Sequence, residues 1–272
     1  MRTLSLGYLS LADVGPMALV EAAGLAGFAS VGVRLTARRP TEPWGHAAVS
    51  DRAARRALAA ALSDKGLALS NVSAYHLYPE VTLDQLKPAV EAAAELGGKS
   101  MIACVYRDAD AALVDLLGRY AELAGDAGLR IAVEAVSYSG CPTLDVARRV
   151  LREVGSPVLG LMLDPLHLQR GGSELAALSS LSADEICIAQ LCDAKAKPPA
   201  GVDAATEART MRLYPGDGEL PLETFVKALP PSTEIELEVP ALEHRSLPAP
   251  ERARLIRSRC LDWLAGVGVQ AR

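Results

Sequence analysis

The sequence predicts an α/β fold in which eight parallel strands close into a barrel, and three observations support this. Strand-like and helical segments alternate from one end of the 272-residue chain to the other. Half of the residues are hydrophobic but only 4% are aromatic, which indicates an aliphatic, alanine-rich core of helices packed on strands. No GxGxxG motif follows the first strand-like run, which weakens the alternative of an open, doubly wound sheet.

The predicted elements follow in regular order along the chain. Strands are expected at Leu4–Tyr8, Ser30–Leu35, Ala68–Ser73, Ser100–Val105, Arg130–Val136, Val158–Asp164, Ile186–Leu191 and Glu234–Val239. Helices are expected at Pro16–Ala26, Asp51–Lys65, Leu83–Leu96, Ala109–Ala127, Thr143–Val154, Ser173–Leu181, Pro221–Leu229 and Pro250–Leu264. Asp51 and Thr143 suit helix N-caps, and Gly155 suits a left-handed C-cap. Eight βα repeats close a parallel sheet, so we predict a single (β/α)8 TIM-barrel domain over residues 1–272.

Composition and charge exclude several classes of partner. The net charge of −5 and the pI near 5.5 argue against nucleic acid, which usually requires a basic face. No run approaches the roughly 18 apolar residues of a membrane span, and the first residues carry no signal-peptide pattern. The five cysteines contain no CxxC motif, so neither a disulfide framework nor a zinc ribbon is indicated. We expect a cytoplasmic protein with reduced thiols and no membrane partner. The sequence does not decide between a monomer and a homo-oligomer.

Four of the predicted strands, the fifth to the eighth, end in a polar side chain. These ends carry Glu134, Asp164, Gln190 and Glu238. A carboxylate that ends a buried strand is costly unless a cation compensates its charge. Because the carboxyl ends of barrel strands meet at one face, we expect the four side chains to lie close together there. Such an oxygen-rich set indicates a site for a divalent metal.

Five blocks, in this order along the chain, carry a resemblance to a known family. They are Gly128–Glu134, the D-x-x-H block Leu161–His167, the block Gln190–Ala194 that is similar to H-x-x-D, the R-x-x-P-G-x-G-x loop Arg212–Glu219, and Glu238–Pro240. The chain resembles the sugar-phosphate isomerase/epimerase superfamily of xylose isomerase-like TIM barrels (AP endonuclease family 2). This superfamily includes ketose 3-epimerases, hydroxypyruvate isomerase, inosose dehydratase, 3-dehydroshikimate dehydratase and endonuclease IV.

The resemblance implies roles for the residues in these blocks. Glu134, Asp164, Gln190 and Glu238 would bind the metal, and His167 and Arg212 would contact the substrate. Many members carry histidine where this chain has Gln190. An amide oxygen is a poor zinc ligand, so we expect one Mn²⁺ or Mg²⁺ in preference to Zn²⁺; the alternative is a weakened or lost site.

Two further residues near the predicted strand ends, Arg34 and Glu236, each have more than one possible role. Arg34 ends the second strand, where it could bind a substrate carboxylate or hydroxyl or form a salt bridge at the rim. Glu236 lies two residues before Glu238 and therefore shares its face of the strand. It is expected to point into the barrel one layer lower, and a carboxylate there has to be paired with a cation or protonated.

A metal site of this kind predicts chemistry at a carbonyl. The metal would polarise the carbonyl of a bound substrate, and Glu134 or Glu238 would remove the neighbouring proton, as paired glutamates do in the epimerases that the chain resembles. We expect an isomerase or epimerase that acts on a small sugar or polyhydroxy carbonyl compound through an enediolate. One alternative is a dehydratase (lyase) of the inosose or 3-dehydroshikimate type. Another is a non-catalytic sugar-binding barrel with a decayed metal site. Endonuclease IV-like repair is disfavoured because the chain has four histidines and a negative net charge.

Overall fold

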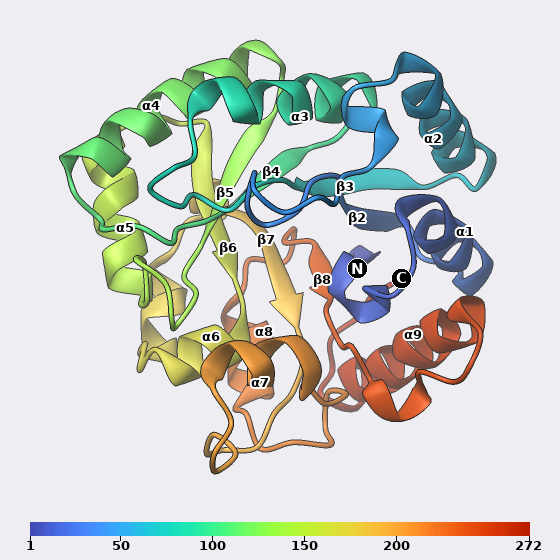
Figure 1. The fold of residues 1–272 in the computed structure, drawn as a ribbon. Coiled ribbons are helices and arrows are strands. Elements are labelled where there is room, and N and C mark those ends of the chain that lie inside the picture. The colour runs from blue at the N-terminus through green and yellow to red at the C-terminus, as the bar shows by residue number, and fades with distance from the viewer.

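Eight parallel strands form a closed barrel, as predicted (Figure 1). The computed structural model describes residues 1–175 and 177–272. In order around the barrel the strands are β1 (Leu4–Leu6), β2 (Ser30–Arg34), β3 (Ala68–Ser73), β4 (Ser100–Cys104), β5 (Arg130–Glu134), β6 (Leu159–Leu163), β7 (Ile186–Leu191) and β8 (Ile235–Leu237). Parallel pairing of β1 with β8 closes the ring. The first and last strands are shorter than predicted.

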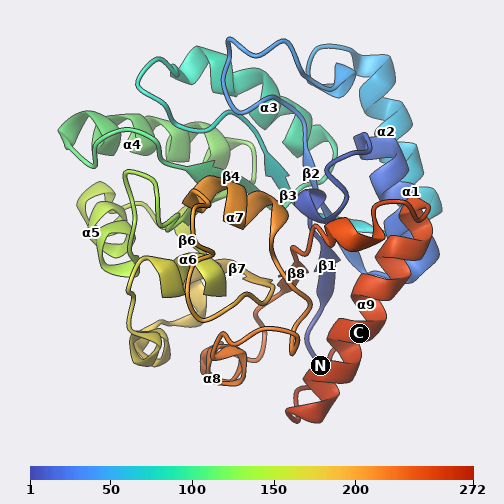
Figure 2. The same ribbon diagram turned by 60° about the horizontal axis from the view of Figure 1, so that its bottom comes forward.

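Helices surround the barrel, with α9 lying beside α1 (Figures 1 and 2). The α-helices are α1 (Pro16–Ala26), α2 (Arg52–Asp64), α3 (Leu83–Glu95), α4 (Ala111–Asp126), α5 (Leu144–Val154), α6 (Pro165–Arg170), α7 (Ala204–Thr210), α8 (Leu222–Ala228) and α9 (Ala249–Gly266). Short 3-10 turns are η1 (Tyr8–Leu11), η2 (Ala47–Val49), η3 (Leu175–Ser180), η4 (Ala183–Glu185) and η5 (Leu242–His244). Within the described residues, no helix combines the length and the apolar character needed to cross a membrane.

The local helix signals act as the sequence predicts. The Asp51 side chain accepts a hydrogen bond from Ala53 N at 2.8 Å, and the Thr143 hydroxyl accepts one from Val146 N at 3.2 Å. Both bonds satisfy N–H groups that a helix leaves unpaired in its first turn. Gly155 ends α5 with a φ of 70°, the left-handed conformation that favours glycine. These caps fix where the helices that cover β3 and β6 begin and end.

The prediction for the segment between β6 and β7 was wrong. A helix was expected at Ser173–Leu181, but the chain there forms the 3-10 turn η3, and the α-helix α6 begins directly after β6. The reason is local: Asp164 caps the helix by accepting from two backbone N–H groups, and Pro165 occupies its first position. Helix α7 was not predicted at all, because its seven residues, AATEART, are too few and too polar to show an apolar stripe.

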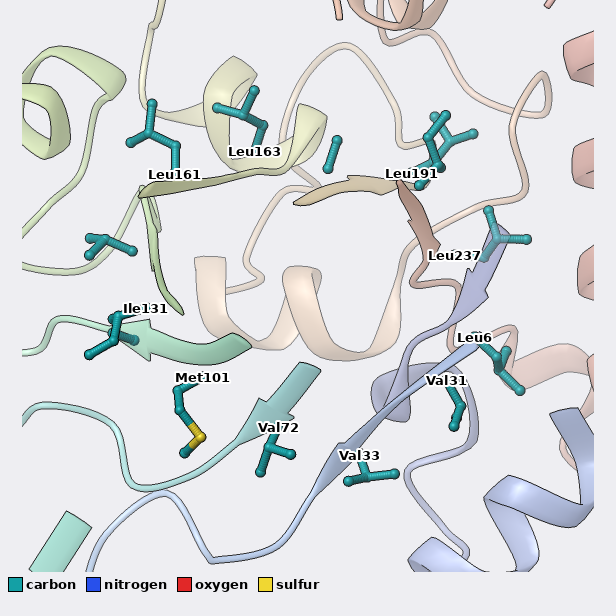
Figure 3. Close-up of a cluster of buried hydrophobic side chains, with 14 of the residues drawn as sticks. Leu6, Val31, Val33, Val72, Met101, Ile131, Leu161, Leu163, Leu191 and Leu237 are labelled. Carbon is teal, nitrogen blue, oxygen red and sulfur yellow. The ribbon is translucent and has the colours of Figure 1, made fainter. Parts of the chain in front are cut away.

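Side chains alternate along the strands, and the two faces have different roles. Those that point outward, such as Val31, Ile131 and Leu161, pack between the barrel and the helices (Figure 3). Those that point inward are apolar on one side of the barrel, where Ile102, Ala132, Met162 and Ile188 form a separate cluster. The opposite side is polar. The main hydrophobic core therefore lies between the strands and the helices, and the interior of the barrel is divided between a small apolar cluster and a polar side.

An ion pair between the buried Arg252 and the partly exposed Asp13 attaches α9 to the first βα connection. Arg252 donates to both carboxylate oxygens of Asp13 at 2.9 Å, and its side chain is only 6% exposed. We expect Asp13→Asn to lower the free energy of unfolding by about 1–3 kcal/mol, because Arg252 would be left buried without its counter-ion. Chemical unfolding at neutral pH measures this. The exposed pair Asp115–Arg119 gives the matched control Asp115→Asn, which should cost less than about 1 kcal/mol.

The same pair also makes a prediction about pH. The hydrogen bond from Arg252 lowers the pKa of Asp13. A carboxylate with a lowered pKa contributes its stability above its ordinary pKa and loses it as the pH falls through the lowered one. The difference between wild type and Asp13→Asn should therefore be full at neutral pH and should shrink in acid. A difference that does not depend on pH would contradict this assignment.

Candidate active site

The predicted ligands lie where the strands end, and all four are buried. Glu134 is the last residue of β5, Asp164 directly follows β6, and Glu238 directly follows β8. Gln190 is within β7, and its register partner on β8 is Glu236. Glu134, Gln190 and Glu238 line one pocket together with the two predicted substrate residues, His167 and Arg212. Asp164 lies beneath this surface, with a side chain that is fully buried.

Arg212 joins two of the predicted ligands. Its Nη1 lies 2.5 Å from Asp164 Oδ2, and its Nη2 lies 3.2 Å from Glu238 Oε2. Burial alone would raise the pKa of Asp164, but Arg212, His167 and backbone N–H groups outweigh burial and lower it. Burial raises the pKa of Glu238, and Arg212 offsets part of that rise. Arg212 therefore stabilises the charges of two carboxylates, a role that its place in the loop motif did not reveal.

Glu134 has no such cation beside it. Its Oε2 accepts a hydrogen bond from Cys104 Sγ at 3.0 Å, and its Oε1 lies 3.7 Å from His167 Nε2. Burial, with the nearby charges of Asp164 and Glu238, raises the pKa of Glu134 to about 8. Burial also lowers the pKa of His167 to about 4, so its ring is neutral at neutral pH. In the absence of a cation Glu134 therefore favours its protonated form at neutral pH, and its ionised form would carry a charge that the described residues only partly compensate.

Gln190 contacts the second carboxylate of β8. Its Nε2 donates to Glu236 Oε1 at 3.0 Å, and Asn71 Nδ2 donates to Glu236 Oε2 at 2.5 Å. Glu236 points into the barrel, as predicted, and burial beside Glu238 raises its pKa to about 7. Gly32 makes room for this cluster, since a Cβ at that position would overlap the Glu236 carboxylate. Gln190 Oε1 is buried and has no hydrogen-bond partner among the described residues.

The Asp193 of the seventh-strand block has a structural role. Its carboxylate accepts hydrogen bonds from the backbone N–H groups of Gly216, Gly218 and Leu220, each at 3.0 Å. A Cβ on Gly218 would overlap that carboxylate, so the glycine is required there. Asp193 thereby holds the loop that follows Arg212, and with it the position of the Arg212 guanidinium.

Arg34, the third predicted substrate residue, also lines the pocket. Its Nη1 donates to Ala74 O at 3.0 Å, its Nη2 lies 2.8 Å from His76 Nε2, and its guanidinium stacks over the Tyr8 ring at 4.7 Å. It forms no salt bridge to a described residue, so the salt-bridge alternative is not what the structure shows. Cys104 and Asn71 could not be predicted as site residues, because their roles depend on neighbours across the barrel.

The donors around the pocket fit a divalent cation. A donor atom from each of Glu134, Asp164 and His167 can be chosen so that all three lie within 4.8 Å of one another. Gln190 supplies a buried carbonyl oxygen that lacks a partner, and Glu134 is a buried carboxylate with too little positive charge nearby. Both features are costly without a cation nearby, and a bound cation would relieve both.

Replacing Gln190 by His should change which metal binds best. Imidazole nitrogen is a better zinc ligand than an amide oxygen, so Gln190→His is expected to bind Zn²⁺ about tenfold more tightly, or about 1.4 kcal/mol. Competition with a chromophoric zinc chelator measures this. Gln169→His is the matched control, because Gln169 is an exposed residue of α6. Equal zinc affinity in both variants would show that position 190 is not a ligand position.

Two curated proteins show sequence similarity to the chain. A 3-dehydroshikimate dehydratase of Pseudomonas putida is 30% identical over 150 residues, which cover 53% of this chain and 23% of the dehydratase. An inosose isomerase of Bacillus subtilis is 24% identical over 193 residues, which cover 66% of this chain and 68% of the isomerase. The chain thus spans only a small part of the dehydratase but most of the isomerase.

Solved structures resemble the whole fold. An IolI protein with a bound zinc atom superposes with a TM-score of 0.80 at 18% identity, covering 98% of this chain and 99% of the other. A D-allulose 3-epimerase from Methylomonas sp., in complex with D-allulose, has a TM-score of 0.70 at 17% identity and 97% coverage of both chains. At these identities the likeness shows the fold alone. Residues 19–259 match the model of one family, so the chain belongs to the xylose isomerase-like TIM barrel family.

Proposed function

We propose that the protein is a metal-dependent isomerase or epimerase that acts on a small sugar or polyhydroxy carbonyl compound through an enediolate. One observation carries the proposal: two buried carboxylates from different strands, Glu134 and Glu238, line a single pocket. No arginine among the described residues contacts Glu134, unlike Asp164 and Glu238, so Glu134 is the carboxylate that is most available to accept a proton from the substrate and to return it. The names of the relatives, which include isomerases and an epimerase, agree with it.

The metal site is assigned to Glu134, Asp164, Gln190 and Glu238, with Mn²⁺ or Mg²⁺ favoured over Zn²⁺ because of Gln190. When bound, the metal would polarise the substrate carbonyl and stabilise negative charge on its oxygen. Arg212 and the backbone N–H groups at the start of α6 hold Asp164 in place. Arg212 likewise holds Glu238.

Two carboxylates explain how a proton is moved. Glu134 or Glu238 takes the proton from the carbon next to the carbonyl, and the enediolate then receives a proton again. Delivery to the opposite face of the same carbon gives epimerisation, and delivery to the neighbouring carbon gives isomerisation. The Cys104 thiol, whose pKa burial and Glu134 hold well above its usual value, stays protonated and donates to Glu134. This contact fixes the orientation of Glu134 without competing for its charge.

His167 and Arg212 are assigned to substrate binding. The neutral ring of His167 can donate or accept one hydrogen bond with a substrate hydroxyl. Of the five N–H groups of Arg212, contacts to Ala208 O, Asp164, Cys192 Sγ and Glu238 account for four. The fifth is left for an oxygen of the substrate, since Arg212 lines the pocket.

A dehydratase is the second candidate. It is supported by the 30% identity with the 3-dehydroshikimate dehydratase of Pseudomonas putida, although the match covers only 23% of that protein. The same first step would serve it, because an enediolate can expel a hydroxyl from the adjacent carbon.

An activity screen in deuterium oxide tests the proposal. The protein, loaded with Mn²⁺ or Mg²⁺, is given keto-sugars, inososes and dehydroshikimate, and products are analysed by NMR. We expect one class to turn over with solvent deuterium at the carbon that was deprotonated, and we expect chelation to stop the reaction. A product with a new double bond would favour the dehydratase. Stoichiometric metal with no exchange in any class would reject the enediolate route, and binding without turnover would favour a sugar-binding barrel.

A further inference from the structure

The carboxylates of the pocket lie at the strand ends, whereas the side wall of the pocket is basic. Three arginines line it: Arg34 at the end of β2, Arg38 in the connection after β2, and Arg209 in α7. They surround His76, and all three lower its pKa electrostatically, in addition to the effect of burial. We call Arg34, Arg38, Arg209 and His76 the basic wall.

Two members of the basic wall have no counter-ion. Arg38 and Arg209 are both half-buried, yet neither guanidinium makes an ion pair or a hydrogen bond with a described residue. Glu42 accepts from the backbone N–H of Arg38, not from its side chain. Several buried arginines elsewhere are paired with a carboxylate, such as Arg170 with Glu207 at 2.7 Å. Desolvated cations without partners are costly, so their position needs an explanation.

Unpaired donors are also buried beside them. The guanidinium of Arg34 can only donate, so His76 Nε2 must accept from it and the ring hydrogen must be on Nδ1. His76 is only 6% exposed, and its Nδ1 has no partner among the described residues. The buried Nε of Arg34 is likewise unpartnered. The basic wall thus contains buried N–H donors beside the pocket that no acceptor among the described residues satisfies.

Neighbouring residues hold Arg34 and His76 in place, and helix α7 positions the backbone of Arg209. The His76 ring stacks on Tyr106 at 5.2 Å, and Arg34 lies over Tyr8. Arg209 is placed by α7, whose Glu207 receives two hydrogen bonds from Arg170. Figure 2 shows α7 in front of the barrel strands, and Arg209 and Ala208 line the pocket from it. Arg34 and His76 are thus fixed before an anion binds, which lowers the ordering cost of the binding step.

We infer that the basic wall binds an anionic group of the substrate, a carboxylate or a phosphate ester. The substrate class is then a polyhydroxy carbonyl compound with an acidic group, in place of a neutral sugar. This rests on the proposed function for the polyhydroxy carbonyl part, which the metal-side carboxylates would process. A neutral sugar would leave Arg38 and Arg209 uncompensated, whereas an oxyanion can accept from several donors at once.

Three polyols test the inference: neutral myo-inositol, quinate with a carboxylate, and myo-inositol 1-phosphate. Their affinities for the Mg²⁺-loaded protein are measured by calorimetry. At least one anion is expected to bind about tenfold more tightly than myo-inositol, and which one does so distinguishes a carboxylate from a phosphate substrate. In Arg38→Met/Arg209→Met the preference should fall to about twofold or less. In Arg119→Met, which removes an exposed arginine of α4, it should be unchanged.

Two further measurements separate the outcomes. Arg38→Lys/Arg209→Lys keeps both charges and should retain most of the preference, which guards against a folding defect in the Met variant. Glu134→Gln should abolish turnover, but when it is compared with wild type in metal-free buffer it should keep the preference for anions, so the failure of one proposal does not imply failure of the other. If neither anion binds more tightly than myo-inositol, including the case in which nothing binds, or if the Met variant keeps the preference, the inference is wrong.

Discussion

Glu134→Gln is expected to lower kcat/KM by about a thousandfold and to reduce metal occupancy together with it. The side chain keeps its size and loses only the carboxylate, which is both a proposed metal ligand and a proposed base, and a positioned base contributes about 10²–10⁴ in rate. The fold should tolerate the change, because burial already favours the uncharged form of Glu134, as its raised pKa indicates. Elemental analysis and steady-state kinetics on the substrate found by the screen measure the two effects.

The controls for this variant are chosen within the chain. Glu238→Gln removes the other pocket carboxylate and should act in the same direction. Glu153→Gln changes a half-exposed glutamate of α5 that pairs with Arg149, and it should leave both metal and turnover unchanged. If Glu134→Gln and Glu238→Gln both keep full metal occupancy, the metal assignment fails. Lost turnover with full metal would make Glu134 a base only.

Arg212→Met is expected to cause the largest loss of stability, about 3–5 kcal/mol. Asp164 and Glu238 have side chains that are 0% and 6% exposed, and both would be left as buried charges without their cation. Chemical unfolding in the absence of metal measures the loss. Excess Mg²⁺ should restore part of it, because a bound cation replaces some of the missing charge and stabilises the folded state by mass action.

Two comparisons make this result interpretable. Arg259→Met removes the guanidinium from the exposed pair with Asp217, where both side chains are about two-fifths exposed, and should cost less than about 1 kcal/mol. Arg212→Lys keeps the charge but lacks the planar fork that reaches two carboxylates, so it should lie between wild type and the Met variant. A loss below about 1 kcal/mol in Arg212→Met would show that the two carboxylates are protonated or solvated when the arginine is absent.

The strands and most helices of the eight βα repeats were predicted from the sequence, whereas the additional short helices α6 and α7 were not. Short, mostly apolar strands and helices with caps, such as the one after Thr143, carry signals within a short window, and the closed barrel followed from their count. Helix α7 carries no such signal, since it is short and polar. Helix α6 was missed because Asp164 was interpreted only as a ligand, although the following proline also marks it as a helix cap.

The residues of the candidate site likewise fall into those that the sequence predicted and those that it missed. Strand ends are recognisable in a sequence, and this is why Glu134, Asp164 and Glu238 were found. Partners across the barrel are not recognisable, because the pairing of Asn71 with Glu236, or of Cys104 with Glu134, depends on the stagger of the closed sheet. The basic wall was missed for a third reason. Arg38 and Arg209 lie in a connection and a short helix, where no periodicity relates a residue to the pocket it lines.

The glycine beside the interior carboxylate restricts how this barrel can change by mutation. Position 32 on β2 and position 236 on β8 are far apart in the chain but share one volume, so the residue at one limits the residues allowed at the other. Any side chain larger than hydrogen at 32 requires a smaller one at 236, and that exchange also removes the acceptor of Asn71 and Gln190. A library that varies position 32 alone would therefore sample mostly misfolded variants. The productive unit for redesigning the floor of this pocket is the whole group of four residues, changed together.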